Sequence, residues 1–124
     1  MSQKKTKVTN KALNTSKANK SAVKGSSKKI QLIMNEIRGK SYNFADSYLK
    51  FSPKKTSKVV LKLLQSCRAN YEYKHGRVDE SRLHLNQAFC TSGTSLKRFQ
   101  PKSMGRAGRI LKRTTHINLE LIAK

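Results

Sequence analysis

Apolar residues recur at a helical spacing through the first half of the chain. The first stripe lies at i, i+3, i+4 and i+7 and consists of Ile30, Ile33, Met34 and Ile37. Ser26 and Ser27 precede this stripe as candidate N-caps, and Gly39 follows it at a position where helices often end on glycine. The spacing therefore predicts a helix over residues 27–38 with one buried face.

Two more helices are expected after it. A short helix is predicted over residues 43–50, and its partial apolar face consists of Phe44, Tyr48 and Leu49. Ser52 and Pro53 give the clearest start signal in the sequence, an N-cap followed by proline at the first helical position. That helix should reach about Tyr73 and end at Gly76. Its stripe is Val59, Val60, Leu63, Leu64, Cys67 and Tyr71.

The apolar period changes from helical to two residues after Arg82. Leu83, Leu85 and Phe89 alternate there with His84, Asn86 and Ala88, with a break at Gln87. Near the end of the chain Ile117, Leu119 and Leu121 alternate with Asn118 and Glu120. These runs predict two antiparallel strands, and Thr91-Ser92-Gly93 is a candidate bend or bulge. Residues 19–24 are a candidate edge strand.

Between these strands lies a basic segment, residues 96–113, with seven Lys/Arg and no acid. Pro101, Gly105 and Gly108 are expected to interrupt any regular element. The segment predicts a loop that becomes ordered against a polyanion, and residues 93–109 should be mobile without one. A merely solvated loop is the alternative. Phe99 and Met104 fit either base stacking or packing on the opposite arm.

Charge points to a negatively charged partner. The chain carries 28 Lys+Arg against 6 Asp+Glu, a formal net charge of +22. Nucleic acid is the leading partner, because an anionic membrane would need an amphipathic helix with apolar anchors.

Residues 1–18 form a low-complexity basic stretch typical of a disordered arm. Lys28 and Lys29 begin a helix, where the dipole disfavours cations, and Lys54, Lys58 and Lys62 recur every fourth residue.

No catalytic, cofactor or metal motif accompanies this charge. His75, His84 and His116 lack partners at a catalytic or metal-ligand spacing, and no glycine-rich nucleotide loop occurs. A ribonuclease using His116 would lack a second acid–base group. Cys67 and Cys90 are far apart, which argues against a disulfide framework and favours a reducing compartment. No secretory signal or membrane-spanning run is evident. The sequence thus predicts a non-enzyme without metal or cofactor.

Three motifs closely resemble the family of universal large-subunit ribosomal protein 22, bacterial or organellar type. They are Ile37-Arg38-Gly39-Lys40, Ser52-Pro53-Lys54-Lys55, and the run from Leu96-Lys97-Arg98-Phe99-Gln100-Pro101 to Gly105-Arg106-Ala107-Gly108-Arg109-Ile110-Leu111-Lys112-Arg113-Thr114-Thr115-His116-Ile117. The similarity covers roughly residues 25–122. Departures from the family pattern are Thr94 in place of a proline, Thr91-Ser92 in place of acids, and Lys102-Ser103-Met104.

The resemblance implies an α+β fold in which three helices pack on a small antiparallel sheet with a long basic β-hairpin extension. It implies a single domain over residues 25–124 after an arm over 1–24, with the hairpin at about 83–120 and its tip at about 93–109. The implied protein is a structural constituent of the large ribosomal subunit. It binds large-subunit ribosomal RNA and neighbouring ribosomal proteins, aids assembly, and lines the nascent-peptide exit tunnel with its hairpin tip, next to the nascent polypeptide.

The family roles can be assigned residue by residue. RNA contacts are expected from Lys28, Lys29, Arg38, Lys40, Lys54, Lys55, Lys97, Arg98, Lys102, Arg106, Arg109, Lys112, Arg113 and His116. The tunnel tip is expected at Leu96, Lys97, Arg98, Phe99, Gln100, Pro101, Lys102, Ser103, Met104, Gly105 and Arg106. The implied location is a ribosome in a bacterial cytoplasm or an organelle, with a plastid stroma favoured over a mitochondrion. An architectural DNA-binding protein that inserts a basic ribbon into the minor groove is the alternative.

Overall fold

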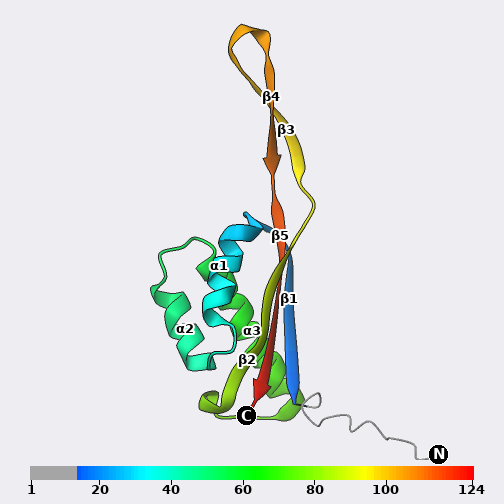
Figure 1. Cartoon of the computed structure of the whole chain (residues 1–124). Helices are drawn as coiled ribbons and strands as arrows, with labels where there is room; N and C mark the ends of the chain where they lie inside the picture. Colours follow the sequence, from blue (N-terminus) through cyan, green and yellow to red (C-terminus); the bar gives the residue numbers. More distant parts are fainter. Residues whose placement is uncertain (1–13) are drawn as a thin grey trace, which may run out of the picture.

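The computed structural model describes residues 14–124 and has two visibly different parts (Figure 1). The elements in chain order are β1 (Thr15–Lys24), α1 (Ser27–Ile37), α2 (Tyr42–Phe51), α3 (Ser57–His75), β2 (Leu83–Ser92), β3 (Leu96–Pro101), β4 (Ala107–Lys112) and β5 (Thr114–Ala123). Short 3-10 turns lie at Glu80–Arg82 and Ser103–Gly105. The α+β class, with helices packed on an antiparallel sheet, is confirmed.

We call residues 14–93 and 114–124 the body. Its sheet has the strand order β1-β5-β2, and both pairings are antiparallel. The helices lie on one face of this sheet (Figure 1). The predicted inward residues of β5, Ile117, Leu119 and Leu121, are buried in one apolar cluster with the stripes of α1 and α3. Apolar burial of this kind is the main favourable contribution to folding.

We call residues 94–113 the hairpin. Its strands β3 and β4 pair with each other from Leu96↔Lys112 to Pro101↔Ala107 and form a separate two-stranded sheet. The expectation that Gly108 would interrupt regular structure is wrong, whereas Pro101 and Gly105 lie at the end of β3 and in the tip turn. Pro101 ends β3, where the missing N–H costs no interior ladder bond. Gly108 lies inside β4, opposite Gln100.

Strand β1 begins at Thr15 rather than residue 19, so residues 15–24 belong to the sheet and are not part of an arm. The pattern concealed this because small residues occupy its inward positions. Ser16 is buried, and its hydroxyl donates to the Cys67 carbonyl at 2.8 Å. A bulge between Lys20 and Val23 further breaks the alternation, with Ala22 at φ 53°. Residues 1–13 of the expected arm lie outside the described part of the chain.

Helix boundaries also differ from expectation. The first helix stops at Ile37, one residue early, and Gly39 adopts the predicted positive φ of 74°. The second helix begins at Tyr42, and its buried residues are Tyr42, Ala45 and Leu49, whereas Phe44 is exposed.

The long helix does not begin at Pro53. Ser52 ends α2 instead, donating its N–H to the Tyr48 carbonyl at 3.0 Å. A turn follows, in which the Ser57 N–H donates to the Lys54 carbonyl at 3.0 Å, and α3 begins at Ser57. It runs to His75, two residues beyond the expected end, and Gly76 at φ 79° terminates it as predicted.

A second bulge changes which residues of β2 point inward. The register shifts between Leu85 and Gln87, close to the predicted break. Ala88 is therefore buried and Phe89 is 40% exposed, the reverse of the expected alternation, because one extra residue exchanges the two faces. Glu120, expected on an open polar face, is only 7% exposed, because it packs beside Asn86 and Lys17.

Candidate nucleic-acid interface

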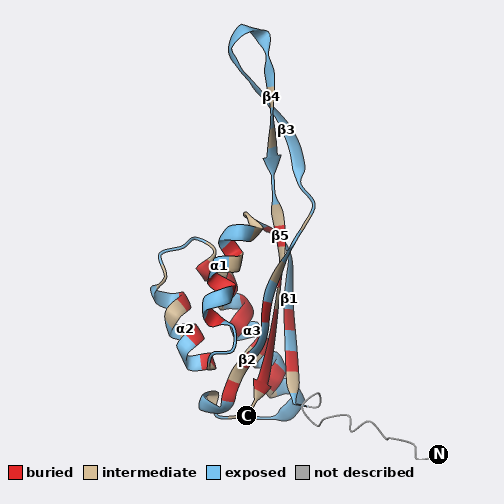
Figure 2. Cartoon of the chain, viewed as in Figure 1, coloured by how far each residue is buried: buried red, intermediate tan, exposed pale blue. Residues whose placement is uncertain are grey.

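The hairpin projects well beyond the body and buries almost nothing (Figure 2). Every residue of β3 is exposed, and β4 has only two partly covered positions. The tip is a tight turn in which Met104 and Gly105 both have positive φ, 60° and 68°. The Lys102 N–H donates to the Arg106 carbonyl across it at 2.7 Å. Met104 is 93% exposed at the far end of this turn.

The cations of the hairpin have no acidic partner. Within residues 14–124 the ion pairs involve only Lys17, Lys50 and Arg68, all of them in the body. On the hairpin, the Arg98 Nη1 donates to the Lys97 carbonyl at 2.8 Å, which is a bond to its own strand. Uncompensated like charges repel one another, so this element favours binding of a polyanion.

The hairpin joins the body at a rigid crossing. The Gly93 N–H donates to the Thr114 carbonyl at 2.8 Å, and the Thr114 hydroxyl donates to the Thr94 carbonyl at 2.6 Å. A Cβ at Gly93 would lie 2.5 Å from the Thr114 Oγ1, so only glycine allows the strands to approach this closely. The crossing fixes the direction in which the hairpin leaves the body.

A cleft at the root of the hairpin continues onto the body. It is lined by Lys24, Gly25, Ser26, Leu96, Leu111, Lys112, Arg113 and Thr114. The Gly25 N–H donates to the Arg113 carbonyl at 3.2 Å, which ties the end of β1 to the hairpin. The root therefore brings predicted contact residues Lys112 and Arg113 next to Lys24, which the sequence did not single out.

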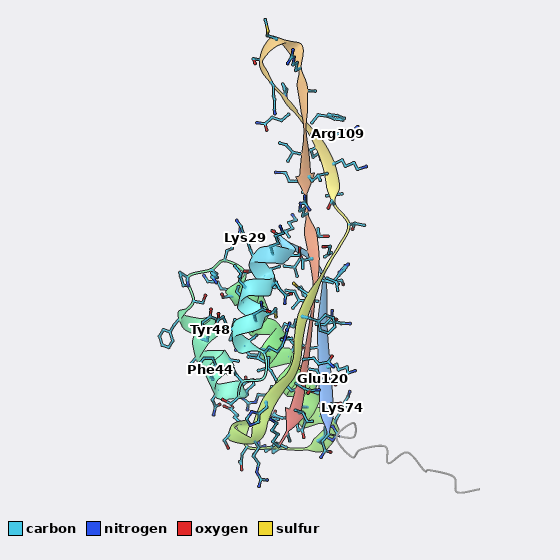
Figure 3. The ribbon with its side chains drawn as sticks, in the orientation of Figure 1. Lys29, Phe44, Tyr48, Lys74, Arg109 and Glu120 are labelled. Carbon is cyan, nitrogen blue, oxygen red and sulfur yellow. The ribbon has the colours of Figure 1, made fainter. Side chains whose placement is uncertain are left out.

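A second hollow, which we call the lysine cleft, shares Lys24, Gly25 and Ser26 with the root. Its remaining lining is Lys29, Leu32, Lys54, Lys55 and Thr56. The cleft lies where α1 and α3 begin, and neither N-cap residue, Ser26 or Thr56, makes a side-chain capping bond. Free N–H groups at helix starts attract anions, and four lysines surround them here. Figure 3 shows Lys29 at the hairpin end of α1 and Arg109 on the hairpin.

The predicted lysine face of α3 is partly correct. Lys58 and Lys62 line a groove with Lys20 of β1, Asn19, Val59, Leu63 and Ser66. Lys54 precedes the helix and belongs to the lysine cleft instead. Lys20 and Lys24 lie within the predicted edge strand, residues 19–24, but were not singled out, because no local pattern shows which helices they lie beside.

The remaining predicted contact residues differ in how free their side chains are to bind RNA. Lys28 is exposed, and the Lys40 Nζ lies 5.6 Å from the Phe44 ring centroid. Arg38 donates from Nε and Nη2 to the Ala88 carbonyl at 3.0 and 2.7 Å, which fastens α1 to β2. The His116 Nδ1 accepts the Ala22 N–H at 3.1 Å, so this nitrogen supports the bulge of β1.

Three of the six acidic residues gather elsewhere on the body. Asp46, Glu72 and Glu80 surround Arg68 and Lys50 beside Tyr42, Gln65 and Ala69. The hydrogen bond to Asp46 raises the pKa of Lys50, and the hydrogen bond to Tyr42 raises the pKa of Arg68. Lys50 and Arg68 in this region are thus already paired. The lysine cleft, the groove of Lys20, Lys58 and Lys62, and the hairpin hold cations without an ion pair within residues 14–124.

Fold and charge together define a nucleic-acid-binding protein of the kind that uses an extended basic ribbon and a basic body. Comparison with known proteins identifies the family. Residues 3–122 match the model of ribosomal protein L22p/L17e, and the chain belongs to that family. It is 39% identical over 97 residues to the large ribosomal subunit protein uL22 of Clostridium novyi (strain NT), covering 78% of this chain and 86% of that protein. The family role is that of a structural constituent of the large ribosomal subunit.

Within residues 14–124, no three or more His, Cys, Asp or Glu residues come together as a metal site. None of the helices in this range combines the length and apolar character needed to cross a membrane.

Proposed function

We propose that the protein binds large-subunit ribosomal RNA through one continuous basic surface, made of the hairpin, its root and the lysine cleft, and thereby aids subunit assembly. The observation that carries this proposal is the hairpin itself, which has no core and no acidic partner for its cations. A surrounding polyanion would supply both the packing contacts and the negative charge that the hairpin lacks. Contact residues would be those predicted, joined by Lys24 and Lys20, and neighbouring ribosomal proteins would complete the surroundings.

We further propose that the hairpin tip, residues 96–106, lines the nascent-peptide exit tunnel and meets the nascent polypeptide. Support comes from its length and from the narrow turn that exposes Met104. A two-stranded ribbon is thin enough to pass between RNA helices where the body cannot. The ribosome would be bacterial or organellar, and the preference for a plastid over a mitochondrion stays a prediction.

The RNA proposal is tested with a charge-matched pair of variants. Lys54→Gln with Lys55→Gln removes two charges from the lysine cleft, whereas Lys50→Gln with Lys74→Gln removes two elsewhere on the body. Binding of each to large-subunit RNA is measured across a salt series. The cleft variant should lower the salt slope by roughly 0.7 to 0.9 per lost phosphate contact, and the control should not. Equal slopes would refute the cleft assignment, and a preference for duplex DNA over RNA would favour the architectural alternative.

The tunnel proposal needs assembled ribosomes. A photoreactive residue at Met104 should crosslink to a radiolabelled nascent chain in stalled ribosomes, because the tip would face the tunnel lumen. A matched probe at exposed Tyr73 on α3 is the control and should not crosslink. Labelling at both positions, or at neither, would contradict a tunnel-facing tip.

A further inference from the structure

The face of the body sheet opposite the helices carries an unusual set of side chains. Successive residues of a strand point to opposite faces, and Ile117 and Leu119 of β5 point into the core. His116, Asn118 and Glu120 therefore point to the open face. The register places Asn118 between Asn19 of β1 and Phe89 of β2, so these three form one row across the sheet.

A hollow of about 300 Å³ lies over this row. It is lined by Lys17, Ala18, Asn19, Gln87, Phe89, Asn118, Leu119 and Glu120. Its size is at the lower end of pockets that accept small planar ligands. Phe89 is the aromatic member of the lining, and 40% of its surface is exposed on an otherwise polar face.

The polar groups of the hollow are free to bind a ligand. Within residues 14–124 the side-chain amides of Asn19, Gln87 and Asn118 make no hydrogen bond. Amide groups donate and accept at once, which suits the edges of nucleobases. These three amides line the same hollow as one aromatic ring, and sheets hold single-stranded bases by combining aromatic stacking with edge hydrogen bonds.

Glu120 gives the hollow its selectivity for bases over phosphates. Its carboxylate accepts from the Asn86 Nδ2 at 3.1 Å and lies 3.7 Å from the Lys17 Nζ. A carboxylate repels phosphate but accepts hydrogen bonds from base amino groups. Lys20 follows Asn19 along β1 and alternates to the other side of the sheet, where it lines a groove with Lys58 and Lys62 of α3. A nucleotide bound here would thus place its base in the hollow and its phosphate away from Glu120.

We propose that the open sheet face binds one unstacked RNA base, which stacks on Phe89 and hydrogen-bonds to Asn19, Gln87 and Asn118. This site is separate from the hairpin and the lysine cleft, and it rests on the proposed RNA-binding function. A protein partner fits less well, because Phe89 is the only exposed large apolar side chain in the lining, and five of the eight lining residues are polar or charged.

The test uses the full chain and single-stranded RNA hexamers of each base. Side-chain amide NMR signals of Asn19, Gln87 and Asn118 should shift on titration, and their shifts yield a dissociation constant. Phe89→Leu should raise that constant about 5- to 150-fold, the range expected for losing one stacked base, and Phe89→Tyr should restore it. Phe51→Leu is the matched control, since Phe51 is an exposed phenylalanine at the end of α2.

Three results would overturn the inference. The first is the absence of amide shifts with every hexamer. The second is an equal dissociation constant for Phe89→Leu and Phe51→Leu. The third is amide shifts that appear only on adding other ribosomal proteins, which would assign the face to a protein partner. If Phe89→Leu does not fold, Asn118→Ser supplies the test, with an expected loss of affinity.

The outcome is separable from that of the proposed function. Wild-type protein that fails to bind large-subunit RNA in the salt series would refute the proposed function. Wild-type protein that binds with the expected slope, while Phe89→Leu behaves as Phe51→Leu, would refute the base site alone.

Discussion

The body and the hairpin are built from the same kinds of residues but owe their shapes to different causes. In the body, three helices cover a sheet whose central strand is buried along its inward face. In the hairpin, Leu96, Phe99 and Leu111 are all exposed, although they are as apolar as core residues. An isolated two-stranded hairpin is marginally stable at best in water. The body can therefore hold its own shape, whereas the hairpin depends on its surroundings.

This difference teaches how a chain with a net charge of +22 can fold at all. Four acids of the body pair with Lys17, Lys50 and Arg68 and neutralise them locally. The hairpin, the lysine cleft and the groove beside α3 hold cations without an ion pair in the described part of the chain, and these lie at the surface, away from the core. Folding of the body then tolerates the charge, and the remaining repulsion is relieved only when a polyanion binds.

The largest effect should come from truncating matched leucines in the two regions. Leu119→Ala, at a residue 2% exposed on the central strand, should lower the free energy of unfolding by about 2 to 5 kcal/mol. Leu111→Ala, at a residue 44% exposed on the hairpin, should change it by less than about 0.5 kcal/mol. Urea unfolding followed by circular dichroism measures both. Similar losses would mean that the hairpin belongs to the core.

A smaller effect is expected at the crossing between the regions. Gly93→Ala places a Cβ against Thr114 and should cost about 1 to 3 kcal/mol, because the two strands must move apart. Thermal unfolding of the free protein and incorporation into large subunits are the measurements. Ser92→Ala, at the exposed neighbouring position, is the control and should be neutral. A neutral Gly93→Ala would show that the crossing is not a fixed joint.

A third comparison concerns backbone protection. Amides of β3 and β4 should exchange with solvent much faster than those of β5 in the RNA-free protein, since no buried contacts hold the hairpin closed. Binding of large-subunit RNA should slow exchange in the hairpin while leaving β5 unchanged. Hydrogen exchange resolved by NMR tests this. Equal protection of the β3 and β5 amides from exchange without RNA would contradict the conclusion that the hairpin depends on its surroundings.

The smallest effect separates two thiols within the body. Burial raises the pKa of the Cys67 thiol, and burial also raises that of Cys90, which is less enclosed. Alkylation at mildly alkaline pH should therefore modify Cys90 first, because Cys67 reacts only when the body opens. Mass spectrometry of partly alkylated protein gives the order. Faster modification of Cys67 would indicate that α3 separates readily from β1.

The raised pKa of Cys67 also predicts a pH dependence. Below the usual thiol pKa both folded and unfolded states keep the proton, and the contribution is constant. Above it the unfolded state loses the proton first, so stability should fall as the pH rises towards the folded pKa. The fall should be smaller in Cys67→Ala, because the raised pKa of Cys90 contributes in the same direction. A stability that rose over this range in the wild type would contradict the assignment.

Local patterns predicted several elements well. The stripe from Ile30 to Ile37 and the alternation from Ile117 to Leu121 each need only their own residues, and the structure buries all of them as expected. The predictions were wrong where the position of a residue depends on a neighbouring segment. Ser52 and Pro53 predicted the start of a helix. Ser52 instead closes the end of α2, so a turn at Lys54–Ser57 separates α2 from α3. Alternation predicted that Phe89 points into the core, but the bulge at Asn86 moves it to the opposite face of the sheet.

The sequence by itself determined the helical stripes, the final strand and the demand for a polyanion, because periodicity and net charge are properties of a chain before it folds. Only the tertiary structure decided which cations act together. Lys54 is distant in sequence from Lys24 and Lys29 and meets them because the turn before α3 lies beside the end of β1 and the start of α1. The row of Asn19, Asn118 and Phe89 likewise exists only through strand register, which depends on pairing between segments that no local pattern links.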